Sequence, residues 1–334
     1  MDLKKVLVAD AVDAACVELL KEHSIEVDCK YKLPKDQLIA EIPNYDGLIV
    51  RSDTKVTEDV IKAAKKLKVI GRAGAGVDNI DVNAATARNI LVLNTPGGNA
   101  ISACELTCSL ITSLARNVIP AAASLKAGRW DRKLYSGYEL YGKTLGILGL
   151  GRIGREVAIR MQAWGMKTVG YDPIVTAEEA KQFNVESLTL EQIWPIADYI
   201  TVHTPLIPET RNLISEAVLN KCKKGVRIVN VARGGIINEA DLLKAIKTGQ
   251  CGGAALDVFE QEPPTNPITL ELIQQEKVIA TPHLGASTAE AQIRVAVEIS
   301  EQLVALTGKS KKIYHYPGSN KQKRIGKPEE IDRG

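Results

Sequence analysis

Paired cysteines, long apolar runs and a strong net charge are all missing from this sequence. Its six cysteines form no CxxC pair, and no histidine or second cysteine pair completes a metal site. We therefore expect buried free thiols in a reducing compartment, and no metal. No stretch approaches the roughly 20 apolar residues of a membrane span, and the N-terminus has no signal-peptide core. A cytoplasmic location, away from membranes, is the resulting expectation.

Charge is sparse in the body of the chain and concentrated at its end. The 334 residues carry a net charge of +3, while residues 309–334 hold eight Lys and Arg against three acids. The body is thus close to neutral, so no nucleic-acid partner is expected for it. The tail is expected to be a solvated, poorly ordered segment. Its basic charge would equally suit RNA, an anionic surface or a protein partner.

What the sequence does contain is a regular alternation of strand and helix patterns. Five Val/Ile/Leu-rich strands joined by helices precede residue 97, and a second series begins at Thr144. A long helix from about Ala100 to Ala127 follows the first series, and an amphipathic helix over about 289–306 follows the second. Buried strands joined by helices indicate α/β domains with parallel, doubly wound sheets. Because a helix follows each series, we expect the second domain to be inserted in the first.

A glycine-rich motif opens the second series. Gly149, Gly151 and Gly154 form G-x-G-x-x-G between a predicted strand and a predicted helix. Such glycines allow a tight turn, close approach of the backbone to a pyrophosphate, and close packing of helix on strand. Asp172 ends the next strand, where an acid accepts hydrogen bonds from both ribose hydroxyls and disfavours a 2′-phosphate. This predicts NAD rather than NADP, although an Asp before Pro173 also suits a capped turn.

Three later strand ends carry residues suited to oxidising a hydroxyl beside a carboxylate. Arg233 can hold the carboxylate and polarise the carbonyl oxygen, and His283 can take the hydroxyl proton. Glu262 can pair with that histidine and fix its orientation. Each residue also has a plain structural interpretation, as a surface arginine, a loop glutamate or a helix-capping histidine. His203 ends a strand too, and spacing alone leaves it open as the base.

The chain resembles the D-isomer-specific 2-hydroxyacid dehydrogenases over roughly residues 4–308. The resemblance rests on motifs that occur in order: GRAGAGVDNID, NTPGGNAISACELT, GKTLGILGLGRIGREVA, VHTPLIPETRNLI, VNVARGGIINE, AALDVFEQEPP and TPHLGAST. It implies a Rossmann NAD-binding domain (99–286) inserted into a flavodoxin-like substrate domain (1–98 and 287–308). It also implies Arg233, Glu262 and His283 as the catalytic set, which selects His283 over His203.

The resemblance also assigns ligand contacts. The cofactor would meet Gly149, Gly151, Arg152, Ile153, Gly154, Asp172, Thr204, Val231, Ala232, Asp257, Gly285 and Ala286, with Asp257 on the nicotinamide carboxamide. The substrate would meet Arg51, Ser52, Arg72, Gly74, Ala75 and Gly76. The backbone of the 72–76 loop would hold the carboxylate, and Arg51 would bind a phosphate. Many relatives have Thr where this chain has Ala75, which would cost about 1 kcal/mol of hydrogen bonding.

Within the family, the resemblance implies NAD-dependent oxidation of 3-phospho-D-glycerate to 3-phosphohydroxypyruvate, at the start of serine synthesis. A glyoxylate or hydroxypyruvate reductase shares the catalytic set and stays open, as does a corepressor-like NAD(H)-sensing protein. A homodimer through the cofactor domain is expected, using the helix near 100–127, with residues 129–133 reaching the neighbouring substrate. Longer relatives continue into further domains, so serine inhibition through such a domain is not expected in this chain.

Overall fold

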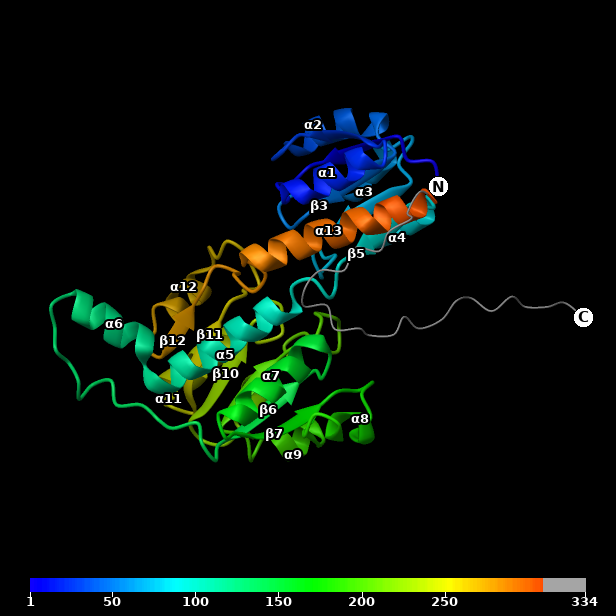
Figure 1. Ribbon diagram of the computed structural model, residues 1–334. Helices are drawn as coiled ribbons and strands as arrows, with labels where there is room; N and C mark the ends of the chain where they lie inside the picture. Colours follow the sequence, from blue (N-terminus) through cyan, green and yellow to red (C-terminus); the bar gives the residue numbers. More distant parts are fainter. Residues whose placement is uncertain (309–334) are drawn as a thin grey trace, which may run out of the picture. The chain divides into compact units, whose positions relative to one another are not determined.

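Contacts divide the chain into two units, which the computed structural model describes over residues 1–308 (Figure 1). The predicted basic tail at 309–334 lies outside the described residues. The first unit holds Met1–Ala73, Val77–Leu93 and the chain from Ala296, and the second holds Gly74–Gly76 and Asn94–Val295. The crossovers predicted near 98 and 287 thus fall at Leu93 and Val295, the latter inside a continuous helix.

The first unit alternates strands and helices as the sequence predicts. Its elements are β1 (Lys5–Val8), α1 (Ala14–Glu22), β2 (Glu26–Cys29), α2 (Lys35–Glu41), a 3₁₀ turn η1 (Ile42–Asn44), β3 (Gly47–Val50), α3 (Glu58–Ala63), β4 (Val69–Arg72), α4 (Val82–Ala87), β5 (Leu91–Asn94) and α13 (Ala289–Leu306), whose first turns belong to the second unit. The strand order is β2-β1-β3-β4-β5, with β1 parallel to both β2 and β3. This is the flavodoxin-like strand order. The chain adds strands toward one edge of the sheet up to β2 and toward the other edge from β3 on, so the strand order reverses between β1 and β3.

Helix α13 packs directly on the sheet of the first unit because two strand residues are glycines. A Cβ on Gly71 would lie 2.8 Å from Ile299 Cγ1, and one on Gly47 would lie 3.8 Å from Leu303 Cδ2. The orange α13 lies along this sheet in Figure 1. Close packing of apolar helix residues on glycine removes water from both surfaces and stabilises the unit.

The second unit is the larger one. Its elements are α5 (Ala100–Arg116), α6 (Val118–Lys126), β6 (Thr144–Leu148), α7 (Arg152–Ala163), β7 (Lys167–Tyr171), α8 (Ala177–Lys181), β8 (Glu186–Ser187), α9 (Leu190–Ile193), β9 (Tyr199–Val202), α10 (Glu216–Leu219), β10 (Val226–Asn230), α11 (Glu239–Thr248), β11 (Cys251–Leu256), α12 (Pro267–Ile273) and β12 (Val278–Ala280). The strand order is β12-β11-β10-β9-β6-β7-β8, and every pairing in this sheet is parallel.

This is the strand order of a Rossmann sheet, in which the order of adding strands reverses between β6 and β9. Alternate strand residues enter separate cores on the two faces, as the period of two requires. Ile147 and Val229 pack with α5 and α7, whereas Ile200 and Ile228 pack on the opposite face around Trp194. The expectation of two doubly wound parallel-sheet domains, one Rossmann and one flavodoxin-like, is confirmed.

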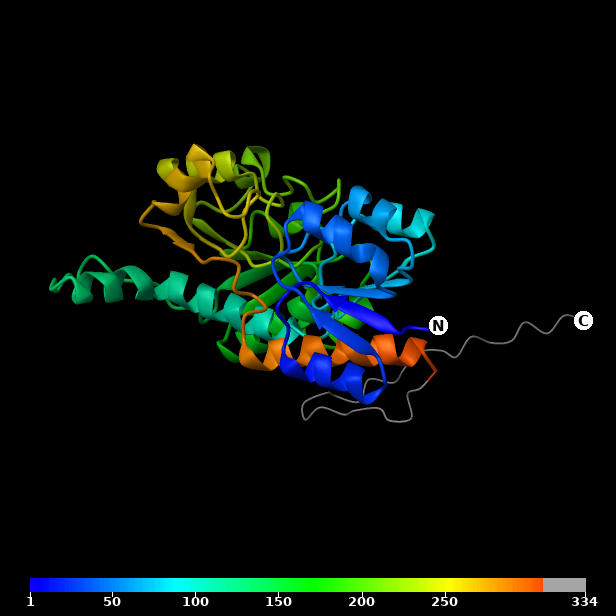
Figure 2. The same cartoon turned by 90° about the horizontal axis from the view of Figure 1, so that it is seen from above.

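The prediction of a single helix from Ala100 to Ala127 is wrong at Asn117. That residue has φ 51°, the left-handed conformation that ends a helix and that asparagine tolerates better than most residues. Helices α5 and α6 therefore meet at an angle of 67°, and the end of α6 extends away from the rest of its unit (Figures 1 and 2). Within residues 1–308, no single helix has the length and apolar character to cross a membrane; only this bent pair, counted together, meets that test.

Candidate functional site

A different physical reason accounts for glycine at each of the three motif positions after β6. Gly149 has φ 96°, and a Cβ there would lie 2.6 Å from the carbonyl oxygen of His203. A Cβ on Gly154 would lie 2.0 Å from the carbonyl oxygen of Gly149, so only glycine lets α7 pack this close to the loop. A Cβ on Gly151 would meet no atom within 4 Å. Gly151 therefore keeps open space above the backbone, where a ligand can approach it.

The open space at Gly151 lies at the N-terminus of α7. That helix begins without a side-chain cap and has no acid in its first turn, so its first amide groups remain available to an anion. Arg152 is exposed at this end, while Ile153 packs against the core. On the neighbouring loop, the buried Thr204 hydroxyl has no hydrogen-bond partner among residues 1–308. These features fit the pyrophosphate of a dinucleotide.

Asp172 is held beside the same loop by backbone amides. One carboxylate oxygen accepts a hydrogen bond from the amide of Leu150 at 2.7 Å. The other oxygen accepts from Ile174 at 2.8 Å and Val175 at 3.1 Å. The side chain is only half-buried, so its remaining acceptor positions can meet ribose hydroxyls. The turn-forming and ribose-binding interpretations of Asp172 are thus compatible.

Arg233 follows β10 in a loop that a buried asparagine shapes. Asn230 accepts a hydrogen bond from the Ala232 amide at 2.9 Å and donates one to the Arg233 carbonyl at 2.8 Å. A Cβ on Gly234 would lie 1.8 Å from the carbonyl oxygen of Phe259. The glycine therefore allows the loop carrying Arg233 to lie directly on the segment that leads to Glu262. The guanidinium is half-buried and donates to the Ala232 carbonyl at 2.7 Å.

Glu262 and His283 form a direct pair. The Nδ1 of His283 lies 2.6 Å from Oε2 of Glu262, and the two side chains are 45% and 35% exposed. Burial acts to raise the pKa of Glu262, but the hydrogen bonds from His283 and the Phe259 amide outweigh it. With the positive charges of His283 and Arg233, they hold that pKa below its ordinary value. The carboxylate is therefore ionised at neutral pH, and Nε2 is the histidine nitrogen left for another partner.

Asp257 anchors the loop that carries His283. This carboxylate is fully buried and accepts hydrogen bonds from Thr281 Oγ1 at 2.6 Å and from the amides of Leu284 and Gly285 at 2.7 and 2.8 Å. The Asp257 carbonyl also accepts the His283 amide. His283 itself has φ 54°, a conformation that costs a side-chain-bearing residue energy and is concentrated at functional sites. Asp257 is predicted to hold the nicotinamide carboxamide of the cofactor. In this structure its carboxylate accepts hydrogen bonds from its own chain.

The other cofactor residues line the same loops. Val231 is buried, and its Cγ1 would lie 3.2 Å from a Cβ on Gly285, so these two loops touch through the glycine. The carbonyl of Ala286 accepts a hydrogen bond from Gln292 Nε2 at 2.6 Å, which joins this loop to α13. The loops after β10 and β12 therefore meet at one edge of the sheet.

His203, the rival histidine, has a different environment. Its Nε2 lies 3.0 Å from the hydroxyl of Thr201. Burial lowers the pKa of His203 to about 3, so this ring stays neutral and is a poor proton acceptor at neutral pH. The geometry favours His283 as the base.

In the first unit, the predicted substrate residue Arg51 follows β3, one of the two strands between which the strand order reverses, and Arg72 ends the adjacent β4. Asp10 lies two residues after the end of β1, and its carboxylate accepts hydrogen bonds from the amide of Arg51 at 2.6 Å and from the Thr54 hydroxyl at 2.6 Å. The register pairs Val50 with Arg72, so Arg51 and Arg72 leave adjacent strands side by side. The buried Nε of Arg51 has no partner among the described residues. Ser52 is exposed, and its hydroxyl donates to Asp53 at 3.3 Å.

The Gly74–Gly76 segment belongs to the second unit, where the start of the 94–99 segment holds it in place. The Thr95 amide donates to the Gly74 carbonyl at 2.9 Å, and Asn94 Nδ2 donates to the Ala75 carbonyl at 2.6 Å. Gly74 has φ 149°, which favours glycine. Two carbonyls of the loop are thus engaged with the protein.

Sequence reasoning missed three polar residues that shape these loops, two of them buried. Asp10 and Asn230 are 3% and 2% exposed, and Asn79 donates to the carbonyls of both Arg51 and Thr54 at 2.7 Å. The signal was present, because Asp10 and Asn230 each stand at the carboxyl end of an apolar strand. Such a buried polar residue needs partners, and the following loop is the nearest source.

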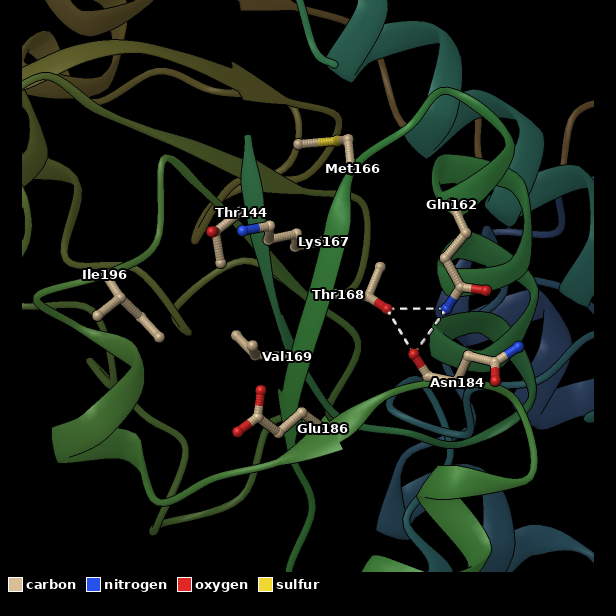
Figure 3. Close-up of a pocket in the computed structure, with 9 residues that line it drawn as sticks. All are labelled: Thr144, Gln162, Met166, Lys167, Thr168, Val169, Asn184, Glu186 and Ile196. Atoms are coloured by element: carbon tan, nitrogen blue, oxygen red, sulfur yellow. Dashed lines mark hydrogen bonds between the residues drawn. The ribbon is translucent and has the colours of Figure 1, made fainter. Parts of the chain in front are cut away.

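A cavity of about 570 Å³ beside β7 carries none of the predicted chemistry. Its lining includes Gln162, Thr168 and Asn184, which lie together at its edge in Figure 3. Gln162 Nε2 donates to the Thr168 hydroxyl at 2.8 Å, and that hydroxyl donates to the Asn184 carbonyl at 3.0 Å. These polar groups satisfy one another, so they do not indicate a ligand.

Comparison with known proteins agrees with this arrangement. Residues 108–285 match the D-isomer specific 2-hydroxyacid dehydrogenase, NAD binding domain. The chain is 57% identical over 310 residues to D-3-phosphoglycerate dehydrogenase of Rattus norvegicus, covering 92% of this chain and 58% of that protein. It therefore spans less than two thirds of this relative's length.

Two solved structures have the same fold with lower identity. A glyoxylate reductase from Paecilomyes thermophila has a TM-score of 0.83 and 28% identity, over 93% of this chain and 97% of that one. D-lactate dehydrogenase from Aquifex aeolicus, complexed with NAD and lactic acid, has a TM-score of 0.79 and 27% identity, over 91% and 96%. The predicted resemblance and the predicted NAD-binding domain are both confirmed.

The glycine geometry predicts that two alanine variants affect different properties, NADH binding in one and thermal stability in the other. Gly151→Ala should leave the melting temperature unchanged, since the new Cβ meets no protein atom, but should weaken NADH binding about tenfold or more by obstructing the pyrophosphate. Gly154→Ala should lower the melting temperature by several degrees, because its Cβ meets the Gly149 carbonyl. Thermal unfolding and NADH fluorescence titration measure both. Wild-type NADH affinity in Gly151→Ala would contradict the assignment.

Proposed function

Since the chain belongs to the D-isomer-specific 2-hydroxyacid dehydrogenase family, we propose that it oxidises 3-phospho-D-glycerate to 3-phosphohydroxypyruvate with NAD. The observation that carries the proposal is the Glu262–His283 pair, at 2.6 Å, on the loops next to the one that carries Arg233. The proposal is further supported by 57% identity to a D-3-phosphoglycerate dehydrogenase, against 28% and 27% to a glyoxylate reductase and a D-lactate dehydrogenase.

In the proposed reaction, the Nε2 of His283 accepts the proton of the substrate hydroxyl. Its Nδ1 donates to the ionised Glu262 carboxylate, which favours the imidazolium formed when the proton arrives. Arg233 binds the substrate carboxylate and polarises the oxygen that becomes a carbonyl. When NAD is bound, its nicotinamide accepts the hydride that leaves the substrate carbon. The loop of Gly149, Gly151 and Gly154 holds the pyrophosphate.

Arg51 is assigned to the substrate phosphate. Its backbone is fixed by the buried Asp10, while its Nε has no partner among residues 1–308. An arginine that is positioned through its backbone and keeps unsatisfied donors suits a phosphate, which accepts several charge-assisted hydrogen bonds. This assignment separates the proposed substrate from unphosphorylated 2-hydroxy acids.

A substrate panel tests the proposal. The rate of NADH oxidation is measured with 3-phosphohydroxypyruvate, hydroxypyruvate and glyoxylate. We expect kcat/KM to be highest for the phosphorylated acid, and Arg51→Gln to lower that value about 10- to 100-fold while changing the glyoxylate value little. A preference for the unphosphorylated acids would instead identify a reductase. NADH binding without turnover on any acid would favour a nucleotide-sensing protein.

The paired residues should respond differently to substitution. His283→Ala should lower turnover by a factor of about 100 or more and leave NADH binding intact, because only the proton acceptor is removed. Glu262→Gln removes the carboxylate that accepts the Nδ1 hydrogen bond of His283 and orients its ring, so kcat should fall about tenfold while NADH binding stays intact. Steady-state kinetics and NADH fluorescence titration measure both quantities; an unchanged kcat would separate Glu262 from the proton transfer.

We also propose that the protein is a cytoplasmic homodimer joined through the cofactor-binding unit. The free thiols of all six cysteines support the cytoplasmic assignment. Ser124 is the only buried residue of α6, a helix of mostly apolar residues. Val118, Ile119 and Leu125 are exposed on it, and Trp130 after it is 79% exposed. An apolar helix that its own chain leaves uncovered suits a second copy. Such pairing would also bring residues 129–133 toward the partner.

A matched pair of substitutions tests the dimer. Ile119 on α6 and Ile159 on α7 are 47% and 48% exposed, so replacing either with Glu introduces the same charge at the same exposure. Ile119→Glu should convert the dimer to monomer, whereas Ile159→Glu should leave it dimeric. Sedimentation velocity distinguishes the two states. A dimer that withstands Ile119→Glu would place the interface elsewhere.

A further inference from the structure

A second polar cavity lies at the opposite edge of the Rossmann sheet from the catalytic loops. Its volume is about 550 Å³, and it is lined at the amino ends of β6, β9, β10 and β11. The catalytic and glycine-rich loops leave the carboxyl ends of strands in that sheet. The cavity is therefore separate from the proposed catalytic residues, although both belong to the same unit.

Basic side chains dominate this cavity. Lys143, Lys224 and Lys277 line it, and none of them forms a side-chain hydrogen bond or ion pair with residues 1–308. Lys223 is neutralised by Asp198, at 2.6 Å from Nζ to Oδ1. Glu276 is the remaining acid among the lining residues. The cavity thus holds an excess of positive charge that its own acids do not balance.

Arg227 strengthens this excess in a fixed position. Its guanidinium lies 4.3 Å from the ring centroid of Tyr138 and 5.4 Å from that of Tyr199. The aromatic faces stabilise the charge but take up none of its N–H donors. Within the described chain the guanidinium makes no hydrogen bond. A planar cation held by stacking, with its donors available, suits a phosphate or carboxylate oxygen.

Tyr199 provides a second, independent indication of a ligand. This side chain is 1% exposed and lines the cavity, and its hydroxyl has no hydrogen-bond partner among the described residues. Buried hydroxyls nearly always have a partner. Phenylalanine would fill the same space without this unsatisfied group. The hydroxyl therefore indicates an acceptor that belongs to a molecule other than this chain.

We propose that this cavity binds a small phosphate-bearing anion. Arg227 and the Tyr199 hydroxyl donate hydrogen bonds to phosphate oxygens, and Lys143, Lys224 and Lys277 supply the balancing charge. Phosphate is favoured over a single carboxylate because one carboxylate cannot balance the net charge of +3 that remains when Asp198 and Glu276 are counted against the four lysines and Arg227 of the lining. The volume lies within the range of small-molecule sites.

The test uses pyrophosphate as the probe and isothermal titration calorimetry as the measurement. Every protein in the test carries Arg51→Gln and is first saturated with NADH, so that pyrophosphate can bind neither the proposed substrate-phosphate site nor the glycine-rich loop. We expect one pyrophosphate per chain in this background, which serves as the wild type of the test. The double variant Lys224→Gln/Lys277→Gln should bind at least tenfold more weakly, and Tyr199→Phe about three- to tenfold more weakly. Neither lysine is buried and Phe keeps the ring of Tyr199, so both variants should fold.

The control is Lys66→Gln/Lys181→Gln, which removes the same charge at two exposed positions outside the cavity. Unchanged pyrophosphate affinity in this control supports a specific site. If the control and Lys224→Gln/Lys277→Gln lose the same pyrophosphate affinity, the loss reflects only the lower net charge of the protein, and the proposal is overturned. Wild-type affinity in Tyr199→Phe, or no binding by the wild type, would also overturn it. None of these outcomes bears on substrate turnover, so the proposed activity is judged separately.

Discussion

The position of the proposed catalytic base depends on a buried carboxylate. Asp257 accepts hydrogen bonds from Thr281, Leu284 and Gly285, so the loop around His283 closes on it from both sides. A buried charge without its donors is costly, and this keeps the loop in place. The same contacts over-determine the left-handed conformation of His283, which an unsupported histidine would leave. The imidazole is thereby directed at Glu262 before any ligand binds.

The sheet brings the three proposed catalytic residues together. Strands β10, β11 and β12 are neighbours, and Arg233, Glu262 and His283 follow them in turn. Parallel strands end at one edge, so residues about 20 to 30 positions apart in sequence meet there. Glycine then sets the spacing. With any side chain at Gly234, the Arg233 loop could not rest on the Phe259 carbonyl, and the arginine would move away from the pair.

Patterns among residues close together in sequence were predictable, and contacts between residues far apart in sequence were not. The parallel sheets followed from apolar strands alternating with helices, and the glycine motif followed from its strand–turn–helix context. The break at Asn117 was missed although the sequence carries a signal for it: Ala115 and Arg116 are good helix formers, but β-branched Val118 and Ile119 and then Pro120 follow the asparagine. Choosing between His203 and His283 from the residues alone needed burial, which spacing does not supply. The anchoring roles of Asp10, Asn230 and Asp257 depend on loops that meet only in the folded sheet.

Unsatisfied buried polar groups are informative only together with other features of a site, because Thr57, Thr95 and Asn99 also keep buried side-chain atoms without a hydrogen-bond partner among residues 1–308. The cavity beside β7 closes its hydrogen bonds among Gln162, Thr168 and Asn184, and nothing there calls for a ligand. Thr204 and Arg51 retain unpaired buried atoms, and both belong to the sites that family membership assigns to cofactor and substrate. Tyr199 retains one as well, in a cavity whose basic lining residues outnumber its acids. If bound molecules account for the unpaired buried atoms of Thr204 and Arg51, the same physical argument applies to the hydroxyl of Tyr199.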